Sequence, residues 1–565
     1  MRRSPYHIYN ENGWYRPPFR EYLNPGMTWC SKKKRGQQTM IKASTVLATS
    51  LVASALLASA SGAFSQPLPG TNSPDASSQD EKRLERFEKQ VEVFRNLLHI
   101  PGMSAAIVKN QQVLWAKGFG FADLESRTPV TPDTVFHLAS ITKTFAATLI
   151  LQLVEQGKLD LDEPMSRYSS DFKDDSVKIK HLLSHTSQGT PGERFQYSGN
   201  RYGYLKAVIE KKHGKPFLNV VVETFFDPLG MSSSVPYHHV VADAEKWRPS
   251  LGQGHLDRYK HNVSRLSPGY TLYGDHEIIR VPYPLPGYVG ASAGFLSTVL
   301  DMAKYDAAID RHVFLKKETQ EKAWTAFVSD SGKRLPYGLG WFVMDDHGLK
   351  LTWHTGHWGT GFSAIYLKVP EKNVTLVLLA NSEALVDHQY QIGRPMVNDI
   401  VNNVFAANFL RLFVFEDMRG RQLPDPTWTL DTQQFSSELS RLSKQSAGYV
   451  YDRERTSQTA LAKWREQRRA QARVAIALDT KVLDTYAGDY QFEPPPHDVH
   501  TVSREGGRLF IDWPKDFKSE LFAESESSFF VKVSPVQLRF IKNEGRVTKL
   551  EFLTGGNTLR MKRIK

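Results

Sequence analysis

The stretch Ser140-Ile141-Thr142-Lys143 decides how this chain is interpreted. It runs into an apolar segment, residues 144–154, in which hydrophobic residues recur at helical spacing, and Gly157 follows just past its end. The pattern predicts a helix with Ser140 at its N-terminal mouth. Because side chains at i and i+3 share one helix face, the ammonium group of Lys143 can reach the hydroxyl of Ser140.

A serine beside a lysine can become a nucleophile. The free hydroxyl is weak and needs an adjacent base. A lysine is such a base only when burial and neighbouring charge lower its pKa toward neutrality, and a helix N-terminus adds a positive field and free N–H groups. Taken alone, the four-residue pattern favours a plainer interpretation, in which Ser140 caps the helix and Lys143 lies on the surface.

Other segments support the chemical interpretation. Residues 103–108 and 113–118 have the composition of two strands, and Lys109-Asn110 between them predicts a hairpin turn. Further along lie four short motifs, here called phrases, that are rich in polar and aromatic residues. These phrases are His181-Leu182-Leu183-Ser184-His185-Thr186-Ser187, Tyr197-Ser198-Gly199-Asn200, Tyr337-Gly338-Leu339-Gly340-Trp341 and His354-Thr355-Gly356.

The order Ser-x-x-Lys, Tyr-Ser-x, His-Thr-Gly resembles the serine β-lactamase/penicillin-binding protein superfamily. Within it, the chain is most similar to the branch of class C β-lactamases, D-alanyl-D-alanine carboxypeptidases, D-aminopeptidases and related esterases. The resemblance covers roughly residues 85 to 415. It implies an α/β (α+β) fold, in which an antiparallel sheet flanked by helices adjoins an all-helical subdomain and the site lies between them.

The resemblance also assigns roles to residues. It implies that Ser140 is the acylated nucleophile, Lys143 its base partner, and Tyr197 the phenol that shuttles a proton to the leaving group. A phenol has an ordinary pKa of about 10, so it needs the nearby ammonium to serve as a base. The backbone N–H groups of Ser140 and His357 would form the oxyanion hole. The segment His354-Thr355-Gly356 would line the substrate cleft, where the glycine lets a substrate backbone approach closely.

Two positions depart from the family pattern. His354 stands where many penicillin-recognising enzymes have lysine, and with an ordinary pKa of about 6.5 it is a weaker anchor for a substrate carboxylate. The family often has asparagine two residues after the tyrosine, but Gly199 occupies that position and Asn200 comes one later. Either Asn200 binds the substrate through a shifted turn, or this amide contact is missing, and we favour the second alternative slightly.

Composition and charge limit the other functional classes. The chain has 565 residues and a formal charge of +12. Residues 1–66 hold nine Lys or Arg and two acids, a net of +7, so the remainder carries an ordinary +5. We find no basic groove with interleaved aromatic residues and expect no nucleic-acid partner. His181 and His185, spaced i and i+4 on an expected helix, lack a third ligand, so we expect neither a metal nor another cofactor.

The N-terminus is typical of a targeting segment. Lys32-Lys33-Lys34-Arg35 and Lys42 precede an apolar, small-residue run over residues 43–63, which ends in Ala-Ser-Ala and Ser-Gly-Ala. We predict cleavage near residues 60–66, a translation start at Met40 and a periplasmic or secreted protein. The alternative is an uncleaved anchor that gives membrane association through this segment. Cys30 lies upstream of the cleavage region, so the mature chain would contain no cysteine.

The sequence divides into five parts. After the N-terminal extension and signal peptide (1–66) we predict a flexible lead-in (67–83), a serine hydrolase domain (84–424), a helical linker (425–479) and a C-terminal domain (480–565). The linker contains Arg465, Arg468, Arg469 and Arg473, which favour a solvated helix over a membrane- or partner-binding face. The C-terminal domain has short alternating strands that predict a small antiparallel barrel, and it resembles a lipocalin-like domain.

We therefore expect a serine hydrolase that acts through an acyl-enzyme on small esters, D-amino-acid amides or peptides, or β-lactams. The alternatives are a dedicated D-alanyl-D-alanine carboxypeptidase or penicillin-binding protein, and a non-catalytic protein of the same fold that binds cell-wall fragments. The expected partner is a small molecule or a peptide. The sequence indicates no oligomeric state.

Overall fold

The computed structural model describes most of the chain from Ser77 onward. The described residues are 77–281, 290–358, 361–390, 400–429, 431–445, 448–493, 498–513, 517–534, 536–554 and 557–565. The predicted signal peptide and most of the predicted lead-in lie outside them. Within the described ranges, no helix combines the length and the apolarity needed to cross a bilayer.

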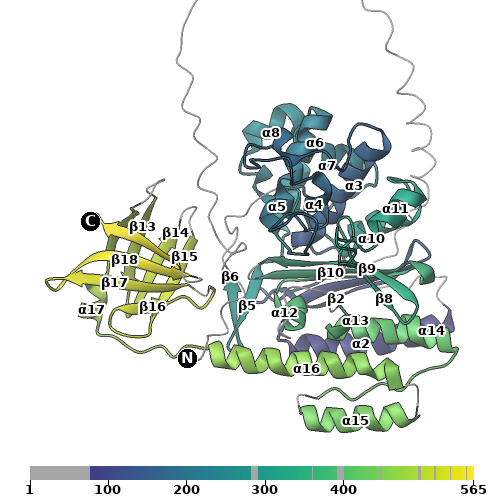
Figure 1. Cartoon of the computed structure of the whole chain (residues 1–565). Helices are drawn as coiled ribbons and strands as arrows, with labels where there is room; N and C mark the ends of the chain where they lie inside the picture. Colours follow the sequence, from purple (N-terminus) through teal and green to yellow (C-terminus); the bar gives the residue numbers. More distant parts are fainter. Residues whose placement is uncertain are drawn as a thin grey trace, which may run out of the picture. The chain divides into compact units, whose positions relative to one another are not determined.

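A seven-stranded antiparallel sheet forms the centre of the larger domain, as counted over the described residues (Figure 1). The strands follow the order β3-β2-β1-β11-β10-β9-β8. The predicted hairpin is confirmed as β1 and β2, but its turn is Asn110-Gln111, because Lys109 still pairs with Gln112. Both turn residues have φ above +50°, as a two-residue hairpin turn requires. The strands are β1 Gly102–Lys109, β2 Gln112–Asp123, β3 Thr128–Pro129, β8 Phe342–Asp346, β9 Leu349–Trp358, β10 Phe362–Val369 and β11 Val374–Ala380.

Both faces of this sheet are covered. Successive side chains of a strand point to opposite faces, and in β11 Val377 and Leu379 join one hydrophobic core while Leu376 and Leu378 join the other. This explains why residues 374–380, which are apolar except for Thr375, show no alternation and are all buried. The elements of the first face are α3 Thr142–Glu155, α4 Ile179–Leu183, α5 Gly199–Gly203, α6 Leu205–His213, α7 Phe217–Val221, α8 Ala244–Leu251, α9 Gln253–Ser264, α10 Val299–Asp310 and α11 Lys317–Ala323.

On the first face, helices α3 to α9 gather into the predicted helical subdomain, with α10 between them and the sheet (Figure 1). Two short strand pairs border it: β4 with β7, and β5 with β6. Their bounds are β4 Phe136–His137, β7 Leu296–Ser297, β5 Gly269–Tyr273 and β6 Glu277–Val281. Strand β4 lies directly before Ser140, so it carries the nucleophile turn toward the helical subdomain.

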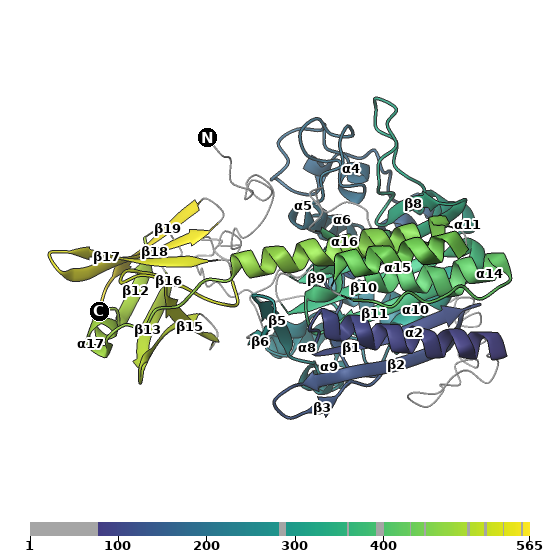
Figure 2. The same cartoon turned by 90° about the horizontal axis from the view of Figure 1, so that it is seen from below.

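The opposite face of the sheet is covered by helices from both ends of the chain (Figure 2). The first is α2, which begins at Ser78, six residues before the predicted start of the hydrolase domain and inside the predicted lead-in. It starts there because the Ser77 hydroxyl accepts a hydrogen bond from the Asp80 N–H at 3.1 Å and thereby caps the helix. The helices of this layer are α2 Ser78–Leu97, α12 Ala384–Tyr390, α13 Val404–Leu410, α14 Glu416–Arg419, α15 Thr432–Gln445 and α16 Gly448–Gln471.

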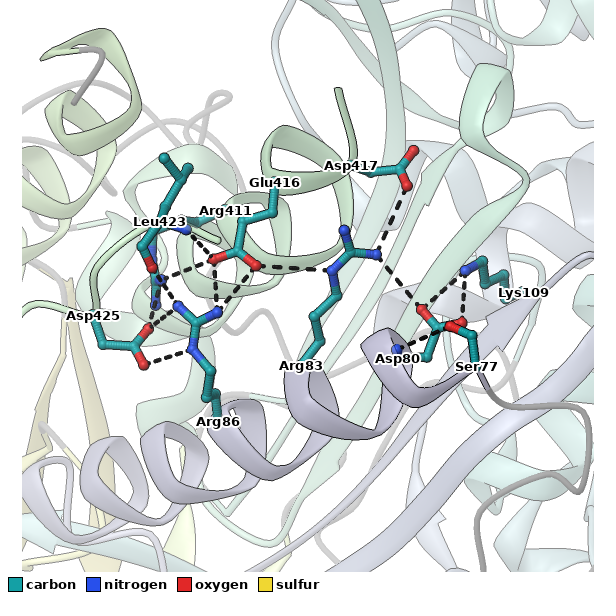
Figure 3. Close-up of polar contacts among 10 residues, drawn as sticks. All are labelled: Ser77, Asp80, Arg83, Arg86, Lys109, Arg411, Glu416, Asp417, Leu423 and Asp425. Carbon is teal, nitrogen blue, oxygen red and sulfur yellow. Dashed lines mark hydrogen bonds and ion pairs between the residues drawn. The ribbon is translucent and has the colours of Figure 1, made fainter. Parts of the chain in front are cut away.

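A buried ion-pair network joins α2 to the segment after α13 (Figure 3). Arg86 lies 2.8 Å from Glu416 and 2.8 Å from Asp425, and Arg411 lies 2.6 Å from Asp425. The Glu416 side chain is only 2 % exposed. Buried charges of this kind persist only when they are paired, so the network holds the first helix of the domain against its last helices.

Helix α16, in the predicted linker, is more buried than a solvated helix would be. The helix is polar in sequence, yet Leu461 and Trp464 are buried in the core that covers the second face of the sheet. Glu454 is also buried and lies 3.1 Å from Arg411. One side of α16 therefore docks on the domain, while residues such as Lys463, Glu466 and Arg469 on its other side are exposed.

The predicted C-terminal barrel is confirmed as a closed antiparallel barrel of β12 to β19 in sequence order, preceded by α17 Thr480–Asp484. It has a hydrophobic core of its own, which includes Tyr486, Phe529 and Phe540. The strands are β12 Gly488–Phe492, β13 Val499–Glu505, β14 Arg508–Trp513, β15 Phe517–Ala523, β16 Ser528–Phe530, β17 Gln537–Asn543, β18 Arg546–Thr554 and β19 Asn557–Arg563.

Candidate active site

Ser140 lies in a tight turn at the entrance to α3. A single 3-10 turn, Ala139–Ile141, leads directly into the helix, as the sequence predicts. Ala139 has φ +47°, a left-handed conformation that is unfavourable for a residue with a Cβ. The buried ring of His137 holds this conformation, because its Nδ1 accepts a hydrogen bond from the Ala139 N–H at 2.9 Å. Strain of this kind, typically about 1–3 kcal/mol, clusters at functional sites.

Lys143 contacts Ser140 directly. Its Nζ donates to the Ser140 hydroxyl at 3.0 Å and to the Ser292 carbonyl at 2.8 Å. The side chain is buried, and this desolvation lowers the pKa of Lys143 to about 7. The amine is therefore partly neutral at physiological pH, which is the condition under which it can accept the proton of the Ser140 hydroxyl. The contact with Ser292 carries no signal in the sequence, because it involves only a backbone oxygen.

The ring of Tyr197 lies beside the same amine. Lys143 Nζ is 5.0 Å from its ring centroid, and Phe342 stacks on the ring with centroids 6.0 Å apart. Tyr197 stands immediately before Ser198, whose hydroxyl accepts from the Arg201 N–H and caps α5. The structure thus brings the nucleophile, the amine and the aromatic ring of the predicted catalytic set into one place.

His185 holds Tyr197 in position, a role that the sequence did not indicate. Its carbonyl accepts from the Gln196 N–H at 2.7 Å, its Nδ1 accepts from the Ser198 N–H at 3.2 Å, and its ring lies 4.2 Å from that of Tyr197. Burial holds the pKa of His185 well below its usual value, so the ring is neutral and can accept.

The predicted helical pair of His181 and His185 is wrong. Helix α4 ends at Leu183, and His185 lies beyond it with φ +55°. The two rings bind different parts of the backbone. His181 Nδ1 accepts from the Lys178 N–H at 3.1 Å, whereas His185 accepts from the Ser198 N–H. Across the described residues, no three His, Cys, Asp or Glu side chains are placed so that they could hold a metal ion.

His354 is a buried neutral ring. Its Nδ1 lies 2.8 Å from the Thr355 carbonyl, so Nδ1 carries the proton and Nε2 accepts from the Tyr337 hydroxyl at 3.0 Å. Burial lowers the pKa of His354 to about 3. A ring with both nitrogens engaged and no charge is not a cationic anchor for a substrate carboxylate. Tyr337, from the third phrase in the sequence, fixes this ring orientation.

Gly356 lets β9 approach the nucleophile turn. A Cβ on Gly356 would lie 2.3 Å from the carbonyl oxygen of Leu138, two residues before Ser140, so only glycine fits. The next residue, His357, therefore brings its backbone close to the Ser140 turn, as the predicted oxyanion pair requires. Thr355 is buried beside them in the same strand. Asn200 is exposed in the first turn of α5, and Gly199 is the residue whose Cβ position faces Lys143 Nζ, at 4.0 Å.

This arrangement can perform acyl transfer. A hydroxyl touches an amine whose pKa is near neutrality, an aromatic ring flanks that amine, and a strand backbone passes close to the hydroxyl. These are the parts that nucleophilic catalysis by serine needs: a nucleophile, an adjacent base and backbone donors for the developing oxyanion.

Comparison with known proteins finds several chains that are similar to this one. Similar proteins include penicillin-binding protein 4* of Bacillus subtilis (strain 168), 22 % identical over 76 % of this chain and 88 % of that protein, and protein flp of Staphylococcus aureus (strain MRSA252), 24 % identical over 61 % and 76 %. Among solved structures, the octameric penicillin-binding protein homologue from Pyrococcus abyssi is 20 % identical, with a TM-score of 0.48, over 85 % of this chain and 99 % of that one.

Two family profiles match different parts of the chain. Residues 472–562, which span the barrel, match a domain of unknown function (DUF3471). Residues 91–394, more than half of the chain, match the Beta-lactamase family. This protein therefore belongs to the Beta-lactamase family, within the serine β-lactamase and penicillin-binding protein superfamily.

Proposed function

We propose that this protein is a serine hydrolase that works through an acyl-enzyme on small esters, D-amino-acid amides or peptides, or β-lactams. The observation that carries the proposal is the 3.0 Å contact between Ser140 and Lys143, in which burial lowers the pKa of the amine to about 7. A surface lysine beside a capping serine would have neither the burial nor the lowered pKa.

The proposed reaction has two halves. Ser140 Oγ attacks the carbonyl carbon of the substrate while its proton passes to Lys143, and the backbone N–H groups of Ser140 and His357 stabilise the oxyanion. When the tetrahedral intermediate collapses, the bond to the leaving group breaks, and that group takes a proton through Tyr197. Water then attacks the acyl-enzyme, releases the acid and returns the proton to Ser140.

The environment of His354 favours uncharged acyl donors. A carboxypeptidase must hold the terminal carboxylate of its substrate, and the buried neutral ring at this position supplies no charge for that task. Esters and amides need no such anchor, so we rank them above D-alanyl-D-alanine peptides. The similarity to penicillin-binding protein 4* of B. subtilis supports the carboxypeptidase or penicillin-binding alternative. The intact set of Ser140, Lys143 and Tyr197 argues against a purely binding role.

The test is a comparison of three substrate classes. The purified protein and Ser140→Ala are assayed with p-nitrophenyl esters, D-alanyl-D-alanine peptides and a chromogenic cephalosporin. We expect turnover of at least one ester and its loss in the variant. Equal rates for the variant and the parent would overturn the mechanism, and covalent attachment of a labelled penicillin without ester turnover would favour the penicillin-binding alternative.

We also propose export through the N-terminal segment, with periplasmic or secreted protein as the mature form. The support is the basic run before residues 43–63 and the small residues at their end. N-terminal sequencing of the protein from its native host tests this. We expect a mature terminus near residues 60–66, whereas an intact N-terminus in a membrane fraction would favour the anchor.

A further inference from the structure

Helix α16 lies outside the segment that matches the Beta-lactamase family, yet two of its side chains converge on Asp387 of α12, the carboxylate that faces His357 of β9. Arg468 lies 2.7 Å from Asp387 and 2.9 Å from Glu383, and it also donates to the Leu272 carbonyl at 2.6 Å. The indole N–H of Trp464 donates to the same Asp387 oxygen at 2.9 Å. One carboxylate of α12 thus accepts from an arginine and a tryptophan that come from one helix.

The other oxygen of this carboxylate faces the residue that follows Gly356. Asp387 Oδ1 lies 3.6 Å from His357 Nε2. Burial by itself would raise the pKa of Asp387, but the charge of Arg468 and the contacts with His357 and Trp464 hold it well below its usual value. Asp387 is therefore a fixed negative charge directed at the His357 ring.

The His357 side chain lies on the face of the sheet that α12 covers, so the Asp387 carboxylate can hold its ring. His357 lies two residues after Thr355, so both side chains lie on the same face of β9. Thr355 pairs with Ile365, whose side chain lies in the core on the α2 side of the sheet. The His357 ring thus points away from α3 and toward α12. In the described residues β8 pairs with β9 only as far as Trp353, so no partner strand of the sheet fixes that edge of β9 where it passes the Ser140 turn.

We infer that α16 positions the oxyanion strand: Arg468 and Trp464 hold Asp387, Asp387 tethers the His357 ring behind the sheet, and the tether keeps the His357 backbone N–H directed at the substrate carbonyl oxygen. This inference rests on the proposed function. Arg468, Trp464 and Asp387 are positioning residues, because they act through His357 and do not touch the substrate.

A pair of substrates provides a specific readout. In the thionoester of a p-nitrophenyl ester, sulfur replaces the carbonyl oxygen and accepts hydrogen bonds poorly, so a well-aligned oxyanion hole favours the oxygen ester strongly. Losing one oxyanion donor costs about 10²–10³ in kcat. We expect Arg468→Met to lower kcat for the oxygen ester at least about ten-fold, with KM nearly unchanged, and to lower the ratio of oxygen-ester to thionoester rates.

Two further variants complete the test. Trp464→Phe keeps the buried ring but removes the donor to Asp387, and we expect a smaller fall in kcat and in the rate ratio. Arg469→Met is the matched control, because Arg469 is the next residue on α16, is 64 % exposed and pairs with Asp275. Its kcat and rate ratio should equal those of the parent.

The possible results separate this inference from the proposed function. If Ser140→Ala is inactive but Arg468→Met and Trp464→Phe keep the parental kcat and ratio, the inference is wrong and the hydrolase proposal stands. A fall in kcat with an unchanged ratio would also overturn it, because loss of folded protein alone would have that effect. If Arg468→Met is insoluble, Trp464→Phe decides. If Ser140→Ala hydrolyses the ester at the parental rate, both proposals fail.

Discussion

At the scale of single residues, the environment of Lys143 determines the pH range of the enzyme. The amine donates to a hydroxyl and a carbonyl and lies against the rings of Tyr197 and Tyr202. These contacts attract the ammonium, but the side chain is buried away from water, and this desolvation lowers the pKa of Lys143 to about 7. The base is thus available without a second charged residue beside it.

The first prediction concerns pH. The neutral form of Lys143 predominates above its folded pKa, so kcat/KM for an ester should rise with pH and level off above an inflection near pH 7. The unfolded chain binds a proton that the folded chain lacks between about pH 7 and the ordinary lysine value of about 10.4, so this group makes stability rise with pH across that window. A rate that keeps rising with pH until an inflection near pH 10 would contradict the lowered pKa.

The second prediction concerns His185. His185→Phe keeps a ring against Tyr197 but removes the acceptor for the Ser198 N–H, so we expect about a ten-fold fall in kcat together with a loss of about 1–3 kcal/mol of stability. His181→Phe is the matched control, because it also removes a buried acceptor for a backbone N–H. It should lose similar stability while kcat changes little. Equal kcat for the two variants, measured with the same ester, would assign His185 a purely structural role.

At the scale of the elements, the ion pairs of α2 differ greatly in burial. Arg86 pairs with Glu416 and Asp425 in the buried network of Figure 3. Three residues later, Lys89 pairs with Glu85 on the surface, where both side chains are more than two-thirds exposed. Exposed pairs contribute little, since water screens them, but breaking a buried pair leaves a charge without compensation.

The third prediction follows from this contrast. We expect Arg86→Met to lower the free energy of unfolding by about 3–5 kcal/mol, and Lys89→Met to change it far less, because water screens its exposed pair. Urea denaturation of both variants measures the difference. A similar stability for the two variants would show that the network contributes no more than a surface pair.

The sequence predicted the elements whose patterns are local. The β1–β2 hairpin, the helix after Ser140 and the barrel strands follow from the periodicity of their own residues. The docking of α16 could not be predicted in this way, because the carboxylate that Arg468 contacts lies 81 residues away in the sequence. The left-handed conformation of His185 was also hidden, since no glycine marks that position.

At the scale of the whole molecule, α16 and the barrel differ in how they relate to the catalytic domain. The barrel has a hydrophobic core that shares no residue with the two cores of the catalytic domain. Helix α16, in contrast, places Tyr451, Leu461 and Trp464 in one of those two cores. The hydrophobic core of the catalytic domain therefore includes residues up to Trp464, which lies in the predicted linker (425–479).

The fourth prediction tests the role of α16 in this core with two shortened chains. A chain that ends at residue 475 keeps α16 and loses only the barrel with its separate core, so we expect it to fold and to retain hydrolysis that depends on Ser140. A chain that ends at residue 445 loses three buried aromatic or aliphatic side chains, each of which stabilises by several kcal/mol, on the order of 2–5. We expect it to be insoluble or inactive, and full activity would contradict the role of α16.

The docking of α16 has a consequence for when the protein can first react. The nucleophile is made early, at residue 140, but the helix that supports the catalytic strand is synthesised more than three hundred residues later. A nascent polypeptide therefore emerges with its reactive serine long before its machinery is complete. If α16 positions the oxyanion strand, hydrolysis should begin only after this helix has left the ribosome.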